Sequence, residues 1–257
     1  MPVIEVGGIK TYFTCHLTDS NDAEPVILVH GAGGDHTTWP AALRRLDGAF
    51  VYALDLPGHG KSDGNAFDSI EAYAGFVKSF IQAAGISKAS FIGHSMGAAV
   101  LLALASEAPD LMESMVLTGA GVRFRVLPAF LEGLRTTPDK VLDRINSYAY
   151  GREVSEEMVA AGRRRLKTVS PETMLNDLTA CDKFDISEKI GEIQVRTLIL
   201  SGDQDLLTPS KFGEFLCHQI KKSKFRIIKD AGHMAHLEQP DIFTDFISQF
   251  LKLGKGK

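Results

Sequence analysis

The chain has 257 residues, of which 44% are hydrophobic and 23% are charged, and its formal net charge is −4. This composition is close to the globular average and excludes wholesale disorder, while the length allows a core that needs no metal or disulfide. The acidic balance argues against nucleic-acid binding, and the apolar run at 98–105 is far shorter than the ~20 residues of a membrane span.

Short runs rich in Val, Ile and Leu recur along the chain and predict buried strands. These runs are continuously apolar, which is the pattern of strands covered on both faces. Residues 4–14 differ, because they predict an antiparallel hairpin that turns at Gly7-Gly8. The six buried strands are predicted at residues 25–30, 50–55, 89–93, 114–118, 197–201 and 224–228.

Helical patterns lie between these strands, at residues 69–84, 96–108, 210–219 and 241–252. Gly85 and Pro109 follow the first two of them as stop signals. Strands that alternate with helices predict an α/β fold with a mainly parallel sheet covered on both faces.

Residues 121–190 break this alternation, because about 70 residues pass without a strand pattern. Helix starts are predicted at Pro138-Asp139, at Ser155-Glu156-Glu157 and at Ser170-Pro171-Glu172, where Ser170 suits the N-cap and Pro171 the first helical position. We interpret the interval as a helical insertion over the sheet, and its Arg163-Arg164-Arg165 run as a solvated helix face.

The pentapeptide Gly93-His94-Ser95-Met96-Gly97 follows a predicted strand and begins a predicted helix. This is the context of a G-x-S-x-G nucleophile elbow, in which glycines leave room for a serine on a strained turn. The alternative is an ordinary turn that joins a strand and a helix. The flanking elements favour Ser95 as a nucleophile.

A serine nucleophile needs a histidine as a base and a carboxylate that orients it, each after a later strand. Asp203 and Asp205 follow the strand at 197–201, and His233 and His236 follow the strand at 224–228. The chain order Ser, acid, His is therefore satisfied.

Five ordered segments carry a resemblance to the α/β-hydrolase superfamily over nearly the whole chain. They are residues 30–34, 55–62, 93–97, 202–209 and 232–240. The resemblance implies an eight-stranded, mostly parallel sheet with a helical cap inserted after the sixth strand. It divides the chain into a core of 1–120 and 191–257 and a cap of 121–190.

The resemblance also assigns roles. The family pattern G-x-x-D-x-x-x-P selects Asp205 over Asp203, and the G-H pattern selects His233 over His236. Gly119-Ala120-Gly121 offers no carboxylate at the other position that some relatives use.

Two backbone N–H groups are expected to form an oxyanion hole. They belong to Met96 and to Ala32, with Gly33 as the fallback for Ala32. Further substrate-binding candidates are Gly31, Gly33, His94 and Leu207, together with the cap residues Phe124, Phe130, Leu134, Tyr148 and Met158. The cap residues have the alternative role of packing the cap helices together.

These residues predict a serine hydrolase that cleaves an ester-like bond of a small, partly apolar molecule through an acyl-enzyme. Lactonase, thioesterase, carbon–carbon hydrolase and metal-free perhydrolase remain alternatives on the same three side chains. A non-catalytic ligand receptor and an interaction protein are the alternatives from other classes. The expected partners are a small ester-like substrate and water, with no nucleic acid and no membrane, and the sequence leaves the oligomeric state open.

No cofactor and no metal is expected, because the phosphate-loop, dinucleotide and metal motifs fail on spacing. Three scattered cysteines and a start without a secretory pattern predict a cytoplasmic location.

Overall fold

The computed structural model describes residues 2–16 and 23–253. Within them the strands form one eight-stranded sheet in the order β1-β2-β4-β3-β5-β6-β7-β8. β2 pairs antiparallel with both β1 and β4, and the remaining neighbours are parallel. The mostly parallel eight-stranded sheet is thus confirmed. The strands are β1 (Val3–Val6), β2 (Ile9–His16), β3 (Glu24–Val29), β4 (Ala49–Leu54), β5 (Ala89–His94), β6 (Met112–Thr118), β7 (Arg196–Gly202) and β8 (Ser223–Ile228).

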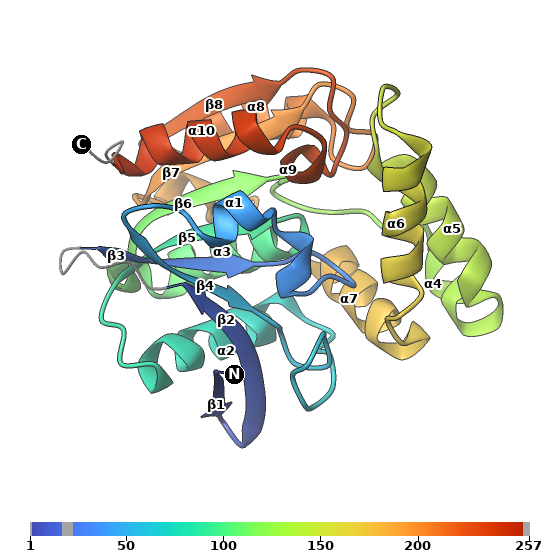
Figure 1. Cartoon of the computed structure of the whole chain (residues 1–257), viewed down its shortest axis with the longest axis horizontal. Helices are drawn as coiled ribbons and strands as arrows, with labels where there is room; N and C mark the ends of the chain where they lie inside the picture. Colours follow the sequence, from blue (N-terminus) through green and yellow to red (C-terminus); the bar gives the residue numbers. More distant parts are fainter. Residues whose placement is uncertain (1, 17–22, 254–257) are drawn as a thin grey trace.

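Helices cover both faces of this sheet (Figure 1). One apolar layer joins the sheet to α2 (Ile70–Ala83), α3 (Met96–Glu107) and α8 (Ser210–Gln219). The other joins it to α1 (Ala41–Arg44), α9 (Ala235–Glu238) and α10 (Pro240–Leu251). Burial on both faces explains why the central strands read as continuous apolar runs. Short 3₁₀ turns add η1 (His36–Thr38), η2 (Pro109–Leu111) and η3 (Ile190–Glu192).

Four helices lie between β6 and β7 and gather at the end of the sheet toward which the β6 and β8 arrows point (Figure 1). They are α4 (Pro128–Thr136), α5 (Pro138–Ala149), α6 (Glu156–Leu166) and α7 (Pro171–Lys183). The predicted starts match α5, α6 and α7, and Ser170 caps α7 as expected. Ser155 likewise caps α6. The start of α4 was missed, because Leu127 precedes Pro128 and supplies no capping side chain.

The insertion has an apolar cluster of its own, built on Leu134, Val141, Leu142 and Met174. Ala32, in the loop after β3, packs against this cluster. The insertion therefore rests directly on the loop that was predicted to form the oxyanion hole. The exact cap boundaries at 121 and 190 stay a prediction.

Within the residues that the structure describes, no helix combines the length and the apolar character that a membrane crossing requires.

Candidate active site

Ser95 occupies a strained turn between β5 and α3. Its backbone has φ 54° and ψ −114°, a conformation that non-glycine residues rarely adopt. A Cβ at Gly97 would collide with the Val29 carbonyl, and one at Gly93 would lie 2.6 Å from the Gly97 oxygen. Glycine at both positions therefore allows β5, α3 and β3 to approach closely enough to present the serine.

The predicted acid and base lie side by side. Asp205 Oδ2 lies 2.9 Å from His233 Nδ1, and both side chains are buried. Burial alone would raise the pKa of Asp205, but the His233 ring and hydrogen bonds from Thr208 outweigh it and lower the pKa. Because Asp205 is then ionised at neutral pH, His233 Nδ1 carries the proton and Nε2 is free to accept one.

Thr208 is a member of this arrangement that the sequence analysis missed. Its hydroxyl donates to Asp205 Oδ2 at 2.7 Å, and its N–H donates to Asp205 Oδ1 at 2.8 Å. Its position three residues after the acid is the available signal, because an Asp side chain commonly accepts N–H groups two and three residues later. These bonds fix the carboxylate rotamer.

The alternative candidates point elsewhere. Asp203 accepts a 3.4 Å hydrogen bond from the Ala231 N–H and lies 3.7 Å from Lys229 Nζ. His236 is fully buried, with its ring 4.5 Å from that of His94, and burial lowers its pKa to about 3. His236 is therefore a neutral packing residue.

Ser95 and His233 line the same cavity, whose volume is about 1190 Å³. No hydrogen bond joins their side chains among the described residues; such bonds commonly tighten only when substrate binds. Gly119 lies against the His233 ring, and a Cβ there would be 2.7 Å from its Cε1. The glycine at the end of β6 thus leaves space for the imidazole.

Hydrogen bonds join the loop after β3 to α7 and to the segment after β4. The N–H of Gly33 donates to Asp177 Oδ2 at 2.8 Å and is therefore engaged, which leaves the Ala32 N–H as the candidate oxyanion donor. His30 Nδ1 donates to the Gly31 carbonyl, and its Nε2 accepts the Leu56 N–H. Burial lowers the pKa of His30 to about 4, so the ring is neutral as these bonds require.

Asp177 on α7 is fully buried and joins the insertion to the core. Besides the Gly33 N–H, it accepts hydrogen bonds from Tyr73 Oη at 2.6 Å and His59 Nε2 at 2.8 Å. Burial would lower the pKa of His59, but the Asp177 carboxylate outweighs it and raises the pKa. No local pattern indicated Asp177, because its partners lie more than 100 residues away in the chain.

Replacing Asp177 by alanine is expected to lower the free energy of unfolding by about 3–5 kcal/mol, since it leaves a buried histidine, hydroxyl and N–H without their acceptor. Urea denaturation measures this loss. Glu172→Gln, at an exposed position of the same helix, should cost less than about 1 kcal/mol. A cost for Asp177→Ala as small as that of the control would contradict the bridging role.

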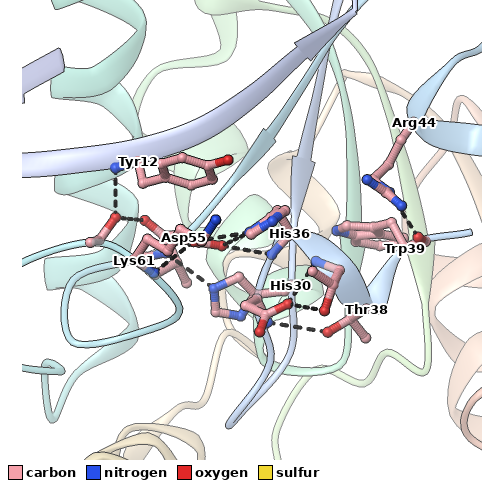
Figure 2. Close-up of polar contacts among 12 residues, drawn as sticks. Tyr12, His30, His36, Thr38, Trp39, Arg44, Asp55 and Lys61 are labelled. Atoms are coloured by element: carbon pink, nitrogen blue, oxygen red, sulfur yellow. Dashed lines mark hydrogen bonds and ion pairs between the residues drawn. The ribbon is translucent and has the colours of Figure 1, made fainter. Parts of the chain in front are cut away.

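A second polar cluster supports the same loop (Figure 2). Asp55 accepts the His36 N–H at 2.6 Å, His36 Nδ1 at 2.8 Å and the Lys61 N–H at 2.9 Å. Asp35, His36 and Asp55 each offer an atom within 4.8 Å of the others, which is close enough to share a cation. However, the Asp55 oxygens already accept these N–H groups, so the contacts connect the loop after β3 to the loop after β4.

The predicted pocket residues divide into two groups. Those that line the cavity are Gly31, Ala32, Gly33, His94, Phe124, Phe130, Tyr148 and Leu207. Two predicted residues do not line it: Leu134 lies in the apolar cluster of the insertion, and Met158 is a half-buried residue of α6. Met96, the predicted oxyanion donor, is fully buried at the start of α3. The cavity also includes apolar residues that were not predicted, among them Leu206, Phe212 and Phe215.

His94 lines the cavity and also helps to position His233, the candidate base. Its Nε2 donates to the His233 main-chain oxygen at 3.1 Å, and its ring is buried. Burial, with smaller contributions from His236 and His233, lowers its pKa well below the usual range. A neutral His94 therefore holds the His233 backbone.

The chain is similar to a hydrolase family model, to a curated hydrolase, and to an esterase and a lactonase of known structure. Residues 26–246 match the model of the Alpha/beta hydrolase family. The chain is 28% identical over 265 residues to 2-hydroxy-6-oxo-6-phenylhexa-2,4-dienoate hydrolase of Burkholderia cepacia, covering 94% of this chain and 92% of that protein. It is 33% identical to a thermophilic esterase of known structure, with a TM-score of 0.85 and coverage of 98% and 96%. The enol-lactonase of Burkholderia xenovorans LB400 shares the fold, with a TM-score of 0.91, 24% identity and coverage of 98% and 100%.

Proposed function

Since this chain belongs to the alpha/beta hydrolase family, we propose that it is a serine hydrolase that cleaves an ester-like bond of a small, partly apolar substrate. The observation that carries the proposal is that Ser95, on its strained turn, opens into the cavity lined by His233, which Asp205 orients. A hydroxyl, an imidazole and an ionised carboxylate are the parts that nucleophilic acyl transfer needs.

In the proposed reaction, Ser95 Oγ attacks the substrate carbonyl carbon while His233 Nε2 accepts its proton. Asp205 stabilises the imidazolium that forms. The N–H groups of Ala32 and Met96 bind the oxyanion. His233 then gives its proton to the leaving alcohol, and an acyl-enzyme remains. Water, activated by His233, hydrolyses that ester and frees Ser95.

Aromatic and aliphatic side chains of the cavity, including Phe124, Phe130 and Leu207, form an apolar environment for the acyl or alcohol part. The 33% identity to an esterase over nearly the whole chain supports an ester as the bond cleaved. The three free cysteines of this chain support a reducing compartment, and we propose that the protein lies in the cytoplasm.

A second candidate reaction is hydrolysis of a carbon–carbon bond. Its support is the likeness to the dienoate hydrolase, which spans 94% of this chain. The substrate in that relative's name is an acid with a hydroxyl and a ketone but no ester, so its hydrolysis breaks a bond between carbon atoms. Lactones, thioesters and peracids are further acyl substrates that the same three side chains could process.

A series of p-nitrophenyl esters, from acetate to laurate, tests the proposal. We expect kcat/KM to rise from acetate by about fourfold for each added methylene, as long as the acyl chain of the substrate still contacts apolar residues of the cavity. The reason is that each buried CH₂ contributes about 0.8 kcal/mol. Turnover of a 2-hydroxy-6-oxodienoate without turnover of any ester would favour the second candidate. Retention of an ester without multiple turnovers would favour a receptor.

A further inference from the structure

The charged side chains that line the cavity all have the same sign. They are Arg123, Arg125, Arg165 and Lys211, and no Asp or Glu side chain belongs to the described lining. The whole chain has the opposite balance, with 32 acidic and 28 basic residues. The cavity is thus electrostatically distinct from the rest of the protein and favours a negatively charged ligand.

Three of these cations lie toward solvent or already have an acidic neighbour. Arg123 and Lys211 are exposed, and the Lys211 ammonium lies over the Phe212 ring. Arg125 is exposed and lies 3.8 Å from the Asp185 carboxylate. These three side chains are therefore the solvent-exposed cations of the lining.

Arg165 differs from them. It is half-buried, and its Nη2 donates a 3.3 Å hydrogen bond to the Thr37 carbonyl oxygen. Within the described residues no carboxylate oxygen lies within 4.0 Å of its guanidinium. Arg163, two residues earlier, donates two hydrogen bonds to Asp143. The predicted solvated helix face therefore fits Arg163 and Arg164, which are exposed, but not Arg165.

The location of Arg165 connects it to the site. Leu166, the last residue of α6, packs on Gly33, where a Cβ would lie 3.4 Å from Leu166 Cδ2. Thr37, which accepts the Arg165 bond, follows the same loop. The guanidinium thus lies beside the segment that carries Ala32. Asp35, the acidic residue of this segment, accepts the Thr37 N–H and hydroxyl at Oδ1. Burial would raise the pKa of Asp35, but these hydrogen bonds, with smaller contributions from His30 and Arg165, lower it.

We propose, building on the hydrolase function above, that the substrate carries a carboxylate and that Arg165 binds it inside the cavity. A guanidinium holds several N–H donors in a planar fork that matches the two oxygens of a carboxylate. Arg165 is half-buried and has no ion-pair partner within 4.0 Å among the residues that the structure describes, so it keeps most of these donors for a ligand. The substrate class is an ester that bears a free carboxylate, such as a half-ester of a dicarboxylic acid.

Two esters with the same five-carbon acyl chain test this assignment. Mono-p-nitrophenyl glutarate ends in a carboxylate, whereas p-nitrophenyl pentanoate ends in a methyl group. We expect Arg165→Gln to lower the ratio of kcat/KM, glutarate over pentanoate, by about 10- to 100-fold, since charge-assisted hydrogen bonds are lost. Arg165→Lys, which keeps the charge without the fork, should give an intermediate ratio.

Arg163→Gln is the matched control, because it removes the same charge from the same helix at a residue that pairs with Asp143. Its ratio should stay within about twofold of wild type, since exposed charges are screened by salt. An unchanged ratio in a folded Arg165→Gln protein, or an equal fall in the control, would overturn the assignment.

A binding measurement separates this inference from the proposed function. Calorimetric titration of Ser95→Ala protein with the glutarate half-ester reports affinity without turnover. We expect the double variant Ser95→Ala/Arg165→Gln to bind about 10- to 100-fold more weakly. If no variant hydrolysed either ester, the hydrolase proposal would fail, but this difference in affinity would still support the anion site. Equal affinities would overturn it.

Discussion

Replacing Ser95 by alanine is expected to lower kcat for a p-nitrophenyl ester by about three to six orders of magnitude, because the hydroxyl that forms the acyl-enzyme is removed. The residual rate would come from binding and from the oxyanion donors. Alanine keeps a Cβ at the strained position, so the fold should be retained. Steady-state hydrolysis and circular dichroism measure the two quantities.

Ser79→Ala is the matched control for this change, since Ser79 lies exposed on α2 and its hydroxyl donates to the Gly75 carbonyl one turn earlier. Its kcat should equal that of wild type. Near wild-type turnover in purified Ser95→Ala protein would remove Ser95 from the mechanism.

Replacing Asp205 by asparagine is expected to lower kcat by about 10⁴-fold, because a neutral amide cannot stabilise the imidazolium and favours the wrong tautomer of His233. The geometry of the turn should survive, since an amide oxygen can still accept the N–H groups of Leu207 and Thr208. The same ester assay measures the loss.

Asp203→Asn provides the comparison, because Asp203 has the same side chain two residues earlier. Among the described residues its side chain contacts the Ala231 N–H and Lys229, so the substitution should change kcat by less than about threefold. A large loss in Asp203→Asn with a mild one in Asp205→Asn would transfer the acid role to Asp203.

The sheet could be predicted because its signals are local. Continuous apolar runs such as residues 25–30 identify strands with two covered faces, and Gly7-Gly8 turns the β1–β2 hairpin at the position expected. Ser95 has a local signal as well, since the two glycines of its elbow are needed for close packing. Element type follows from neighbouring residues where burial is uniform.

Contacts between distant segments have no such signal. Asp177 reads as an ordinary helical acid until α7 places it against Gly33, and Arg165 reads as part of a basic run until α6 turns it toward the cavity. Leu134 and Phe130 both lie on α4, yet one packs inside the insertion and the other lines the cavity. Helical periodicity identifies an apolar face but not what that face will meet.

Covalent labelling tests the central claim most directly. Protein treated with a p-nitrophenyl alkylphosphonate, which phosphonylates activated serines, is digested and examined by mass spectrometry. We expect one phosphonyl group on Ser95, lost in Ser95→Ala and strongly slowed in His233→Ala. An unmodified Ser95 in protein that still hydrolyses esters, or a label on another serine that tracks the loss of activity, would contradict nucleophilic catalysis by Ser95.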